Sequence, residues 1–203
     1  GLYIQAINKT EYTRNNPNWK IRNTSNGFFT TFIVNYLRSS TPTLMSKLAL
    51  YAGSFDPFTF GHLDVLEQAL QVFERVCVTV AVNSGKTFVF TPQERCALIR
   101  EATAHLKGVE VSFFEGLLVN HAAQIGANAL IRGIRQMSDF DYEFRMAIAN
   151  RRLSPQIATV VFIPNPIHLV TSSSLVREIW HWGGDISMYV PQVVLEALQK
   201  KSK

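Results

Sequence analysis

From Lys47 onward, short and almost entirely apolar runs alternate with longer stretches whose apolar residues recur at helical spacing. A short apolar run rich in β-branched residues is typical of a buried strand, and the longer stretches are typical of amphipathic helices. Because the runs are apolar throughout, each strand needs cover on both faces. The sequence therefore predicts an α/β fold: a doubly wound five-stranded parallel sheet with helices on both sides and further helices at the C-terminus.

The expected strands are residues 48–52, 76–82, 109–114, 128–131 and 158–163. The expected helices are residues 62–73, 91 to about 105, 117–125, 138–152, 172–182 and a last one from residue 191. Thr91, Pro92 and Glu94 have the pattern of a capping box with proline in the first turn. Ser138 is expected to cap the fourth helix, with Asp139 in its first turn. Ligands of such sheets bind beyond the carboxyl ends of the strands, so we expect functional residues directly after strands.

Composition changes near residue 45. Residues 1–45 are rich in Asn and Thr and carry +4 of the chain's net charge of +5, so the remainder is nearly neutral. We expect residues 1–45 to be an N-terminal extension, accessory or carried along from upstream sequence, with Met45 as a natural initiator and residues 46–203 as the functional domain. The alternative is an arm that pairs with a neighbouring subunit. A nearly neutral body also argues against nucleic acid as a partner, because long polyanions need clustered Lys and Arg.

The two cysteines, Cys77 and Cys96, show no C-x-x-C spacing, and each falls in an apolar stretch. They are expected to be buried, reduced thiols, which favours a cytoplasmic protein. No apolar run has the length of a membrane span, and no membrane partner is expected. Of the tryptophans, Trp180 and Trp182 are expected to pack within the protein rather than to stack on a base.

The ten residues from Gly53 to His62 follow the first expected strand and read Gly-Ser-Phe-Asp-Pro-Phe-Thr-Phe-Gly-His. Gly53 lets a ligand approach the backbone closely, Ser54 offers a hydroxyl, and Pro57 stiffens the turn. His62 lies near the start of the next helix, where exposed N–H groups and the helix dipole favour anions. The segment predicts a phosphate site. The alternative is a glycine-containing turn whose histidine only caps the helix.

This segment resembles the signature of the nucleotidylyltransferases related to class I aminoacyl-tRNA synthetases, G-[ST]-F-D-P followed by T-x-G-H. From about Leu48 to Leu198 the chain is similar to one family of that group, the phosphopantetheine adenylyltransferases. The other motifs that carry this similarity are Lys86, Thr91-Pro92-Gln93-Glu94-Arg95, Ile131-Arg132-Gly133-Ile134-Arg135, Asp139-Phe140-Asp141-Tyr142-Glu143 and Ser172-Ser173-Ser174-Leu175-Val176. Their order and spacing fit that family.

The resemblance implies a Rossmann-like nucleotidyltransferase fold and a step of coenzyme A biosynthesis, in which ATP and 4′-phosphopantetheine give dephospho-coenzyme A and pyrophosphate. The acceptor phosphate is already anionic, so no side chain has to deprotonate it. Catalysis then depends on positioning and on charge stabilisation at the α-phosphorus. The resemblance also implies a homohexamer and feedback by coenzyme A. Mg²⁺ is expected with ATP, because it neutralises phosphate charge, and the sequence shows no dedicated set of metal ligands.

By resemblance, Ser54 and Phe55 contact the nucleotide, and His62 stabilises charge on the α-phosphate in the transition state. Three hydroxyls at the start of a helix, with the N–H groups there, suit phosphate binding. The other nucleotide contacts that the resemblance implies are Gly133, Ile134, Arg135, Glu143, His168, Leu169, Val170, Thr171, Ser172, Ser173 and Ser174. His168 stands where relatives often have Trp, which puts the adenine contacts of this loop in question.

The acceptor contacts also follow from the resemblance. Lys86 holds the acceptor phosphate as a compact cation. Arg132 contacts the pantetheine arm, Leu118 lines the same pocket where relatives often have Met, and Ser54 touches the acceptor as well as the nucleotide.

Each of these residues has a second interpretation. Lys86 could be a solvated loop lysine, and Arg132 and Arg135 could form surface ion pairs, which contribute little. Glu143 could simply complement the start of its helix, and Ser172 could be a plain N-cap.

Two other functions fit parts of the pattern. One is a different member of the same group, a nicotinamide mononucleotide adenylyltransferase or a cytidylyltransferase, against which the Ile131–Arg135 and Ser172–Val176 motifs argue. The other is a non-catalytic nucleotide-binding or RNA-binding module, against which the presence of both His62 and Lys86 argues.

Overall fold

The computed structural model describes residues 48–82, 85 and 87–201. The predicted N-terminal extension, residues 1–45, lies outside the described residues, and so does Lys86.

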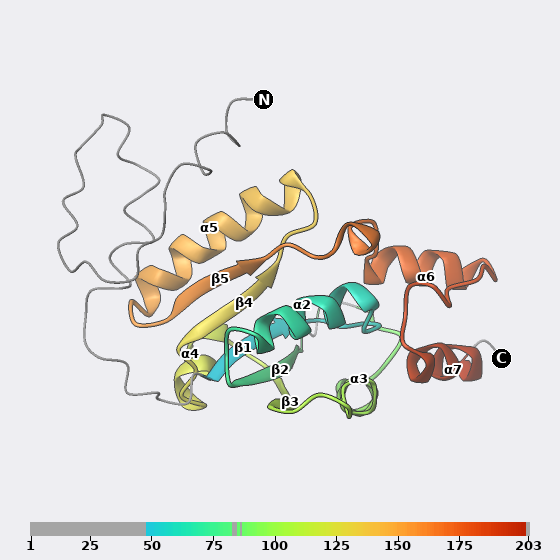
Figure 1. The fold of residues 1–203 in the computed structure, drawn as a ribbon, viewed down its shortest axis with the longest axis horizontal. Coiled ribbons are helices and arrows are strands. Elements are labelled where there is room, and N and C mark those ends of the chain that lie inside the picture. The colour runs from blue at the N-terminus through green and yellow to red at the C-terminus, as the bar shows by residue number, and fades with distance from the viewer. Residues whose placement is uncertain (1–47, 83–84, 86, 202–203) are drawn as a thin grey trace, which may run out of the picture. The chain divides into compact units, whose positions relative to one another are not determined.

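The described chain forms the parallel sheet that the sequence predicts (Figure 1). Its five strands lie in the order β3-β2-β1-β4-β5, and every neighbouring pair is parallel. The strands are β1 (Leu48–Gly53), β2 (Arg75–Ala81), β3 (Val109–Phe114), β4 (Ala129–Gly133) and β5 (Ala158–Phe162). The chain moves outward from β1 to β3 and then returns to place β4 on the other side of β1. This reversal puts the switch point between β1 and β4, where sheets of this kind bind ligands.

Helices cover both faces of the sheet, as expected, because successive side chains of a strand point to opposite faces. Ala49 and Tyr51 of β1 belong to the larger core cluster, and Leu48 and Leu50 belong to the smaller one. The larger cluster includes residues of α2 (Phe60–Leu70), α3 (Pro92–Ala102), α6 (Ser173–His181) and α7 (Gln192–Lys201). The smaller cluster lies under α4 (Leu118–Gln124). Both faces of the sheet are therefore covered by packed apolar side chains. The carboxyl edge of the sheet remains for the functional residues.

The predicted free thiols are confirmed: Cys77 and Cys96 are both buried and unpaired. The capping box of α3 is also confirmed, with the Thr91 hydroxyl accepting from the Glu94 N–H at 3.2 Å and the Glu94 carboxylate accepting from the Thr91 N–H at 2.7 Å. Among the described residues, no helix is both long and apolar enough to cross a bilayer.

Two local predictions were wrong. α5 (Met137–Leu153) begins before Ser138: its N-cap is Gln136, which makes no side-chain capping bond. The Asp139 carboxylate instead accepts from the Arg135 N–H at 3.2 Å, which closes the turn ahead of the helix and places Ser138 inside the first turn. Trp182 does not pack into the core: 80% of it is exposed at the end of α6, where its ring meets only the edge of His181 among the described aromatic contacts.

Trp180 does pack, against the larger cluster, and its indole N–H donates to the Leu198 carbonyl at 3.2 Å. The contrast with Trp182 follows from their positions, since Trp180 faces α7 from within α6 and Trp182 is the C-cap residue of that helix.

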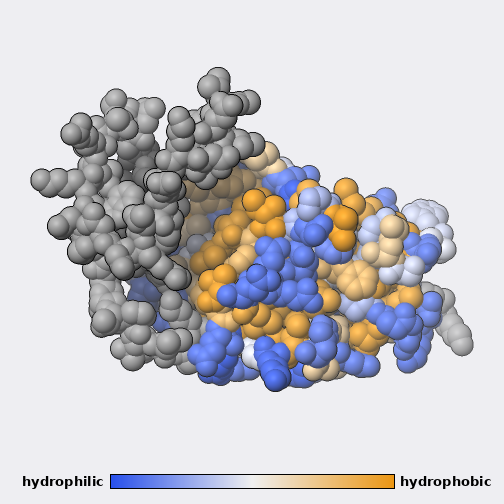
Figure 2. All heavy atoms as spheres, viewed as in Figure 1, coloured by the Kyte–Doolittle hydropathy of each residue, from blue (hydrophilic) through white to orange (hydrophobic). Residues whose placement is uncertain are grey.

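α5 differs from the other long helices in how little it buries. Its one fully buried residue is Asn150, whereas large apolar side chains lie exposed along it. They are Met137, Phe140, Tyr142, Phe144, Ile148 and Leu153. Figure 2 shows apolar side chains gathered in the region where Figure 1 places α5 and β5.

Candidate active site

A cleft of about 290 Å³ opens at the carboxyl ends of β1 and β4, at the switch point of the sheet. Its walls come from the turn after β1, the start of α2, the end of β4 and the start of α6. The cleft brings together most of the residues that the sequence predicts for the site: Ser54, Phe55, His62, Arg132, Gly133, Arg135, Glu143, Thr171, Ser172, Ser173 and Ser174. Segments far apart in the chain thus converge on one volume.

Several predicted residues do not line this cleft. The Ile134 N–H continues the sheet ladder by donating to the Phe162 carbonyl at 3.0 Å. His168 stacks on Phe60 with ring centroids 6.2 Å apart, and Leu169 and Val170 follow it outside the wall. Leu118 packs against the smaller core cluster. The roles of these residues, like that of Lys86, stay predictions.

The structure also adds residues that the sequence analysis did not select, among them Tyr51, Thr59, Val65 and Pro164. Thr59 could have been found, because it is the threonine of the T-x-G-H motif. Burial raises the pKa of the Tyr51 phenol above its ordinary value, so this side chain is neutral. Val65 lies 3.1 Å from where a Cβ on Gly133 would stand, so a side chain there would meet α2.

His62 both caps α2 and faces the cleft. With Thr59 as N-cap, it completes a capping box: the His62 N–H lies 3.3 Å from the Thr59 hydroxyl, and the Thr59 N–H donates to the His62 Nδ1 at 3.1 Å. A backbone N–H can only donate, so Nδ1 must accept, and the proton of the neutral ring lies on Nε2. His62 therefore does cap the helix, as the alternative interpretation holds, but capping does not exclude a second role. Capping uses Nδ1 alone and leaves the Nε2–H free for a ligand.

Aromatic rings surround the imidazole of His62. Phe55 meets it edge-on at 5.0 Å between centroids, and Phe58 stacks on it at 5.6 Å. Although the residue keeps some exposure where it lines the cleft, this burial lowers its pKa to about 3, and the charge of Arg135 adds to the effect. The ring is therefore a neutral hydrogen-bond donor at neutral pH, and it presents a dipole rather than a full charge to a phosphate.

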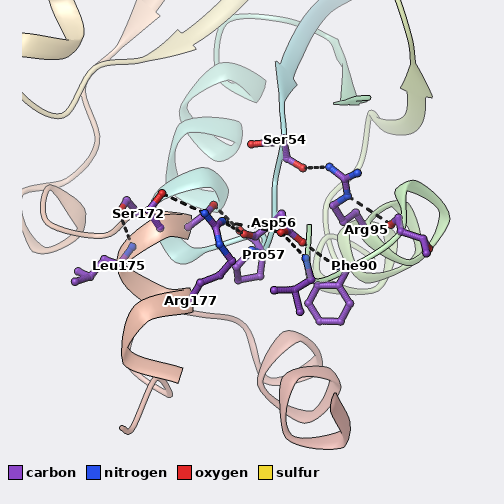
Figure 3. A network of polar contacts seen from close by, with 12 residues as sticks. Ser54, Asp56, Pro57, Phe90, Arg95, Ser172, Leu175 and Arg177 are labelled. Atoms are coloured by element: carbon purple, nitrogen blue, oxygen red, sulfur yellow. Dashed lines mark hydrogen bonds and ion pairs between the residues drawn. The ribbon is translucent and has the colours of Figure 1, made fainter. Parts of the chain in front are cut away.

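The turn from Ser54 to Pro57 is held by charged groups from other elements (Figure 3). The Arg95 guanidinium donates to the Ser54 carbonyl at 2.7 Å, and the Arg177 guanidinium donates to the Asp56 carbonyl. Phe55 has a φ of 48°, which non-glycine residues rarely adopt, and these bonds on both sides of it hold that conformation. The Phe55 ring is buried against Tyr51 and His62, so it supports the site from behind and leaves Ser54 exposed on the cleft.

Arg132 and Glu143 form a pair on the wall of the cleft. Their side chains are only 19% and 18% exposed, and Nε of Arg132 lies 3.1 Å from a carboxylate oxygen of Glu143. The contact is an ion pair without the alignment of a hydrogen bond, and neither atom has an aligned bond to any described residue. Another guanidinium nitrogen of Arg132 donates to the Ala52 carbonyl at 2.9 Å. This is a largely buried pair with unused hydrogen-bonding capacity, which differs from the solvated surface pair considered as the alternative.

Arg135 lies beside the start of α6. It donates to the Thr171 carbonyl at 3.1 Å, and its Nε lies 3.4 Å from the Asp139 carboxylate. It therefore bridges the end of β4 to the segment that leads into α6. Arg135 was interpreted either as a nucleotide contact or as a member of a surface ion pair. The structure contains the ion pair, with Asp139, and also places Arg135 on the cleft wall.

The three serines at the start of α6 make different contacts. Ser172 is the N-cap, and its hydroxyl accepts from the Leu175 N–H at 3.0 Å. The Ser173 hydroxyl donates to the Pro57 carbonyl at 2.8 Å, and the Ser174 hydroxyl accepts from Arg177 at 3.4 Å. Ser173 thus joins α6 to the turn after β1, whereas Ser172 and Ser174 bond within the helix. The backbone N–H groups of the first helical turn remain suited to an anion.

The described residues contain no group of three His, Cys, Asp or Glu placed to hold a metal ion. Glu143 is the only carboxylate among the described residues that line the cleft, and Arg132 neutralises it.

Comparison with known proteins identifies relatives across most of the chain. A family model described as cytidylyltransferase-like matches residues 50–179. The phosphopantetheine adenylyltransferase of Caldanaerobacter subterraneus subsp. tengcongensis is 43% identical over 157 residues, which are 77% of this chain and 98% of that protein. The phosphopantetheine adenylyltransferase of Alkaliphilus metalliredigens is 44% identical over 156 residues, 77% of this chain and 99% of that protein.

A solved structure shares the fold. It is a protein from Vibrio parahaemolyticus proposed to be a nicotinate-nucleotide adenylyltransferase, with a TM-score of 0.59 and 21% identity over 77% of this chain and 94% of that one. At this identity the similarity concerns the fold alone.

Proposed function

The chain belongs to the phosphopantetheine adenylyltransferases, and from this premise we propose that its cleft transfers adenylate from ATP to 4′-phosphopantetheine with His62 as the charge-stabilising donor. The products are dephospho-coenzyme A and pyrophosphate, so the reaction is a step of coenzyme A biosynthesis. The observation that supports this role for His62 is its fixed tautomer. Its Nδ1 is occupied by the Thr59 N–H at 3.1 Å, and its Nε2–H is left for the cleft.

The proposed chemistry needs no proton transfer. An oxygen of the acceptor phosphate attacks the α-phosphorus of ATP, the new P–O bond forms, and the bond between the α-phosphorus and the bridging oxygen breaks as pyrophosphate leaves. Negative charge shifts among the phosphoryl oxygens as this happens, and donors already in place stabilise it without reorganisation. A neutral Nε2–H donor suits this task, since it keeps its proton throughout the cycle.

The nucleotide is proposed to lie between the turn after β1 and the start of α6. The N–H groups of the first turn of α6, with Ser173 and Ser174, would meet the distal phosphates, and Arg135 would contact them from β4. Gly133 and Ser54 would line the path of the ribose and α-phosphate. These roles are supported by the position of all five residues on the cleft wall.

The acceptor is proposed to enter beside Arg132, whose Nε has no aligned hydrogen bond to the residues that the structure describes. Lys86 would hold its phosphate, and Leu118 would contact the pantetheine arm. ATP would arrive as its Mg²⁺ complex. The metal is then part of the substrate and is held by phosphate oxygens, because Glu143 is the only carboxylate that the described lining residues supply.

We propose a homohexamer with feedback by coenzyme A, working in the cytoplasm. Two observations support parts of this. The apolar side chains along α5, such as Phe140 at 44% and Phe144 at 54% exposed, suit contact with a second copy of the chain. Cys77 and Cys96 are free thiols, as in proteins of reducing compartments. Light scattering on the purified full chain measures the assembly, and titration with coenzyme A measures the feedback.

A panel of acceptors tests the function. Pyrophosphate release is measured with ATP and each of phosphopantetheine, nicotinamide mononucleotide and nicotinate mononucleotide. We expect release with phosphopantetheine alone. Release with a mononucleotide and none with phosphopantetheine would overturn the proposal in favour of the related adenylyltransferases.

Replacing Lys86 sharpens the assignment of the acceptor phosphate. Lys86→Ala is expected to raise the KM for phosphopantetheine by about ten- to a hundredfold, the loss typical of a charge-assisted contact, with little effect on the KM for ATP. Lys107→Ala, a lysine before β3, is the matched control. Unchanged acceptor kinetics in Lys86→Ala would contradict the role.

The same assay examines the N-terminal extension. Removing residues 1–44 is expected to leave turnover intact if this segment is accessory. Complete loss of turnover would instead favour the arm that pairs with a neighbouring subunit.

A further inference from the structure

Asp56 is a wholly buried carboxylate that joins two loops. Its exposed fraction is 0%, and it lies in the turn after β1. One carboxylate oxygen accepts from the Val89 N–H at 2.9 Å and the other from the Phe90 N–H at 3.0 Å. The two oxygens thus hold successive backbone amides of the loop between β2 and α3.

Two arginines surround Asp56 and belong to different helices. Arg95 of α3, only 1% exposed, donates to the Ser54 carbonyl, and its guanidinium carbon lies 4.2 Å from the ring centre of Phe88. Arg177 of α6 donates to the Asp56 carbonyl, and it lies 4.0 Å from the Asp56 carboxylate. A buried charge persists only with such partners. Asp56 therefore links the turn after β1, the loop before α3 and the start of α6 through charged contacts.

A second element holds the same loop from the other side. Lys201, at the end of α7, donates to the Val89 carbonyl at 3.1 Å, and its ammonium lies 5.0 Å from the ring centre of Phe90. It also pairs with Glu94 at 3.0 Å. Residues 88–90 are therefore held by Arg95, Asp56 and Lys201 together.

Residues 88–90 are close in sequence to a residue that the proposed function assigns to the acceptor. Lys86 lies three positions before Val89, and Ser54 lies two positions before Asp56. In the proposed function, which this inference rests on, Lys86 binds the acceptor phosphate and the turn at Ser54 binds the nucleotide. In-line transfer requires the reacting atoms to be held about 3–3.5 Å apart, so the spacing of these two loops bears directly on the rate.

We propose that Asp56 is a positioning residue: its carboxylate fixes the Val89–Phe90 amides, and so sets the position of residues 88–90, called here the acceptor-phosphate loop because they follow Lys86 in the sequence, against the turn at Ser54. It touches neither reactant, since it is buried and bonded to the backbone on both oxygens. The role differs from plain stabilisation of the fold. Losing the Asp56 carboxylate should weaken binding of the acceptor phosphate far more than binding of ATP.

The variant Asp56→Asn tests this in the full-length chain. The amide keeps one acceptor oxygen but turns an NH₂ group toward an N–H, and it removes the charge between Arg95 and Arg177. The measurements are kinetics with both substrates, calorimetric binding of ATP and of phosphopantetheine, and competition by pantetheine, which has the same arm without the phosphate. Glu110→Gln, which breaks the exposed Arg75–Glu110 pair near the amino end of β3, is the control.

We expect Asp56→Asn to weaken the binding of phosphopantetheine about tenfold or more and to lower kcat. The affinity for ATP should change less than about threefold. Competition by pantetheine should stay unchanged, because that ligand does not use the acceptor-phosphate loop. The control should behave as the wild type. Equal weakening of ATP, phosphopantetheine and pantetheine, or no change in any of them, would overturn the proposal.

Lys201→Met provides a milder test should Asp56→Asn fail to fold, as circular dichroism would show. It removes the bond to the Val89 carbonyl at an exposed site, and we expect a rise of about two- to threefold in the KM for phosphopantetheine alone. An unchanged KM would then count against the proposal. Should the wild type bind both substrates without turnover, the proposed reaction fails, yet the calorimetric comparison still decides the role of Asp56.

Discussion

Two segments that line the same cleft are built in opposite ways. The turn after β1, residues 54–58, is mostly buried: Phe55 is 2%, Asp56 0% and Phe58 1% exposed. The segment after β5, residues 163–171, is mostly open, with Ile163 at 71% and Val170 at 70% exposed. Both follow a parallel strand and lead toward a helix, but β1 is the central strand of the sheet and β5 is an edge strand, which leaves the segment after β5 nearer to solvent.

The bonds that hold the two segments differ in the same sense. Charged groups from α3 and α6 hold the turn after β1, and they are bonded to its backbone. Two side chains of α2 tether the segment after β5 near solvent: Asp64 accepts from the Asn165 N–H at 2.9 Å, and Gln68 donates to the Ile163 carbonyl at 3.1 Å. Arg135 then holds its far end at Thr171.

This difference suits a division of labour in a transfer reaction. Groups at the reacting phosphorus must already be in place, because reorganisation during the reaction costs rate. A loop that only closes on the rest of the nucleotide can order when the ligand arrives, at some cost in affinity. We therefore expect substitutions in the buried turn to change turnover more than ATP binding, and substitutions in the open segment to change ATP binding by a few-fold with little change in turnover.

The largest effect should come from His62. His62→Ala removes the Nε2–H donor, and we expect kcat to fall by about 10²–10³, the usual effect of losing one donor at a developing charge. ATP binding should change little, because the donor acts chiefly in the transition state. Single-turnover kinetics and calorimetry measure the two quantities. If ATP binding instead fell by 10²–10³ while kcat was preserved, the proposed difference between the two segments would be wrong.

Phe55 and Phe58 of the turn pack on the ring of His62 in α2, and its desolvation should be visible as a pH dependence of the free energy of unfolding. The pKa of His62 is about 3 in the folded protein and about 6.5 in the unfolded chain, so below pH 6.5 the unfolded state binds more protons. Its titration leaves the free energy of unfolding unchanged above pH 6.5 and should lower it by about 1.4 kcal/mol per pH unit from there toward pH 3. Urea unfolding of the wild type and of His62→Gln at several pH values isolates this slope. Parallel curves for the two proteins would mean that the ring is not desolvated.

Asp64, which holds the open segment at Asn165, should affect turnover less than His62 does. Asp64→Asn weakens the acceptor for the Asn165 N–H, and we expect a loss of about 0.5–1.5 kcal/mol in the free energy of unfolding and a rise of a few-fold in the KM for ATP. Its kcat should remain within about twofold of the wild type, since no reacting group moves. A fall in kcat comparable with that of His62→Ala would show that the segment is as preorganised as the turn.

The smallest effect should come from an exposed side chain of the same segment. Val170→Ser changes a side chain that is 70% exposed, and we expect the free energy of unfolding to change by no more than about 0.5 kcal/mol. Thermal unfolding with and without ATP measures it. A clear loss of stabilisation by ATP would place Val170 on the bound nucleotide, as the family resemblance implies.

The pattern of apolar runs was enough to predict the sheet, since parallel strands buried on both faces leave a continuous apolar signal. β1, β2, β3 and β5 begin within one residue of their predicted starts, and the predicted cap of α3 at Thr91 is confirmed. β4 runs two residues further than predicted, because Arg132 and Gly133 still pair with β5 although they break the apolar run. The cap of α5 was missed because the Asp139 carboxylate, and not the nearer Ser138, bonds to the backbone of the turn.

From the sequence alone, Gly53 to His62 could be predicted as a phosphate site, because these residues are contiguous and their expected roles follow from one strand, one turn and one helix start. The family could also be predicted from the sequence. The way that turn is held could not be predicted: Arg95, Asp56 and Arg177 lie up to 121 positions apart in the chain, and their contacts depend on which helices the sheet brings together. The tautomer of His62 could not be predicted from the sequence either. Local sequence encodes propensities and caps, whereas buried charge pairs and the protonation of a ring depend on surroundings that exist only after folding.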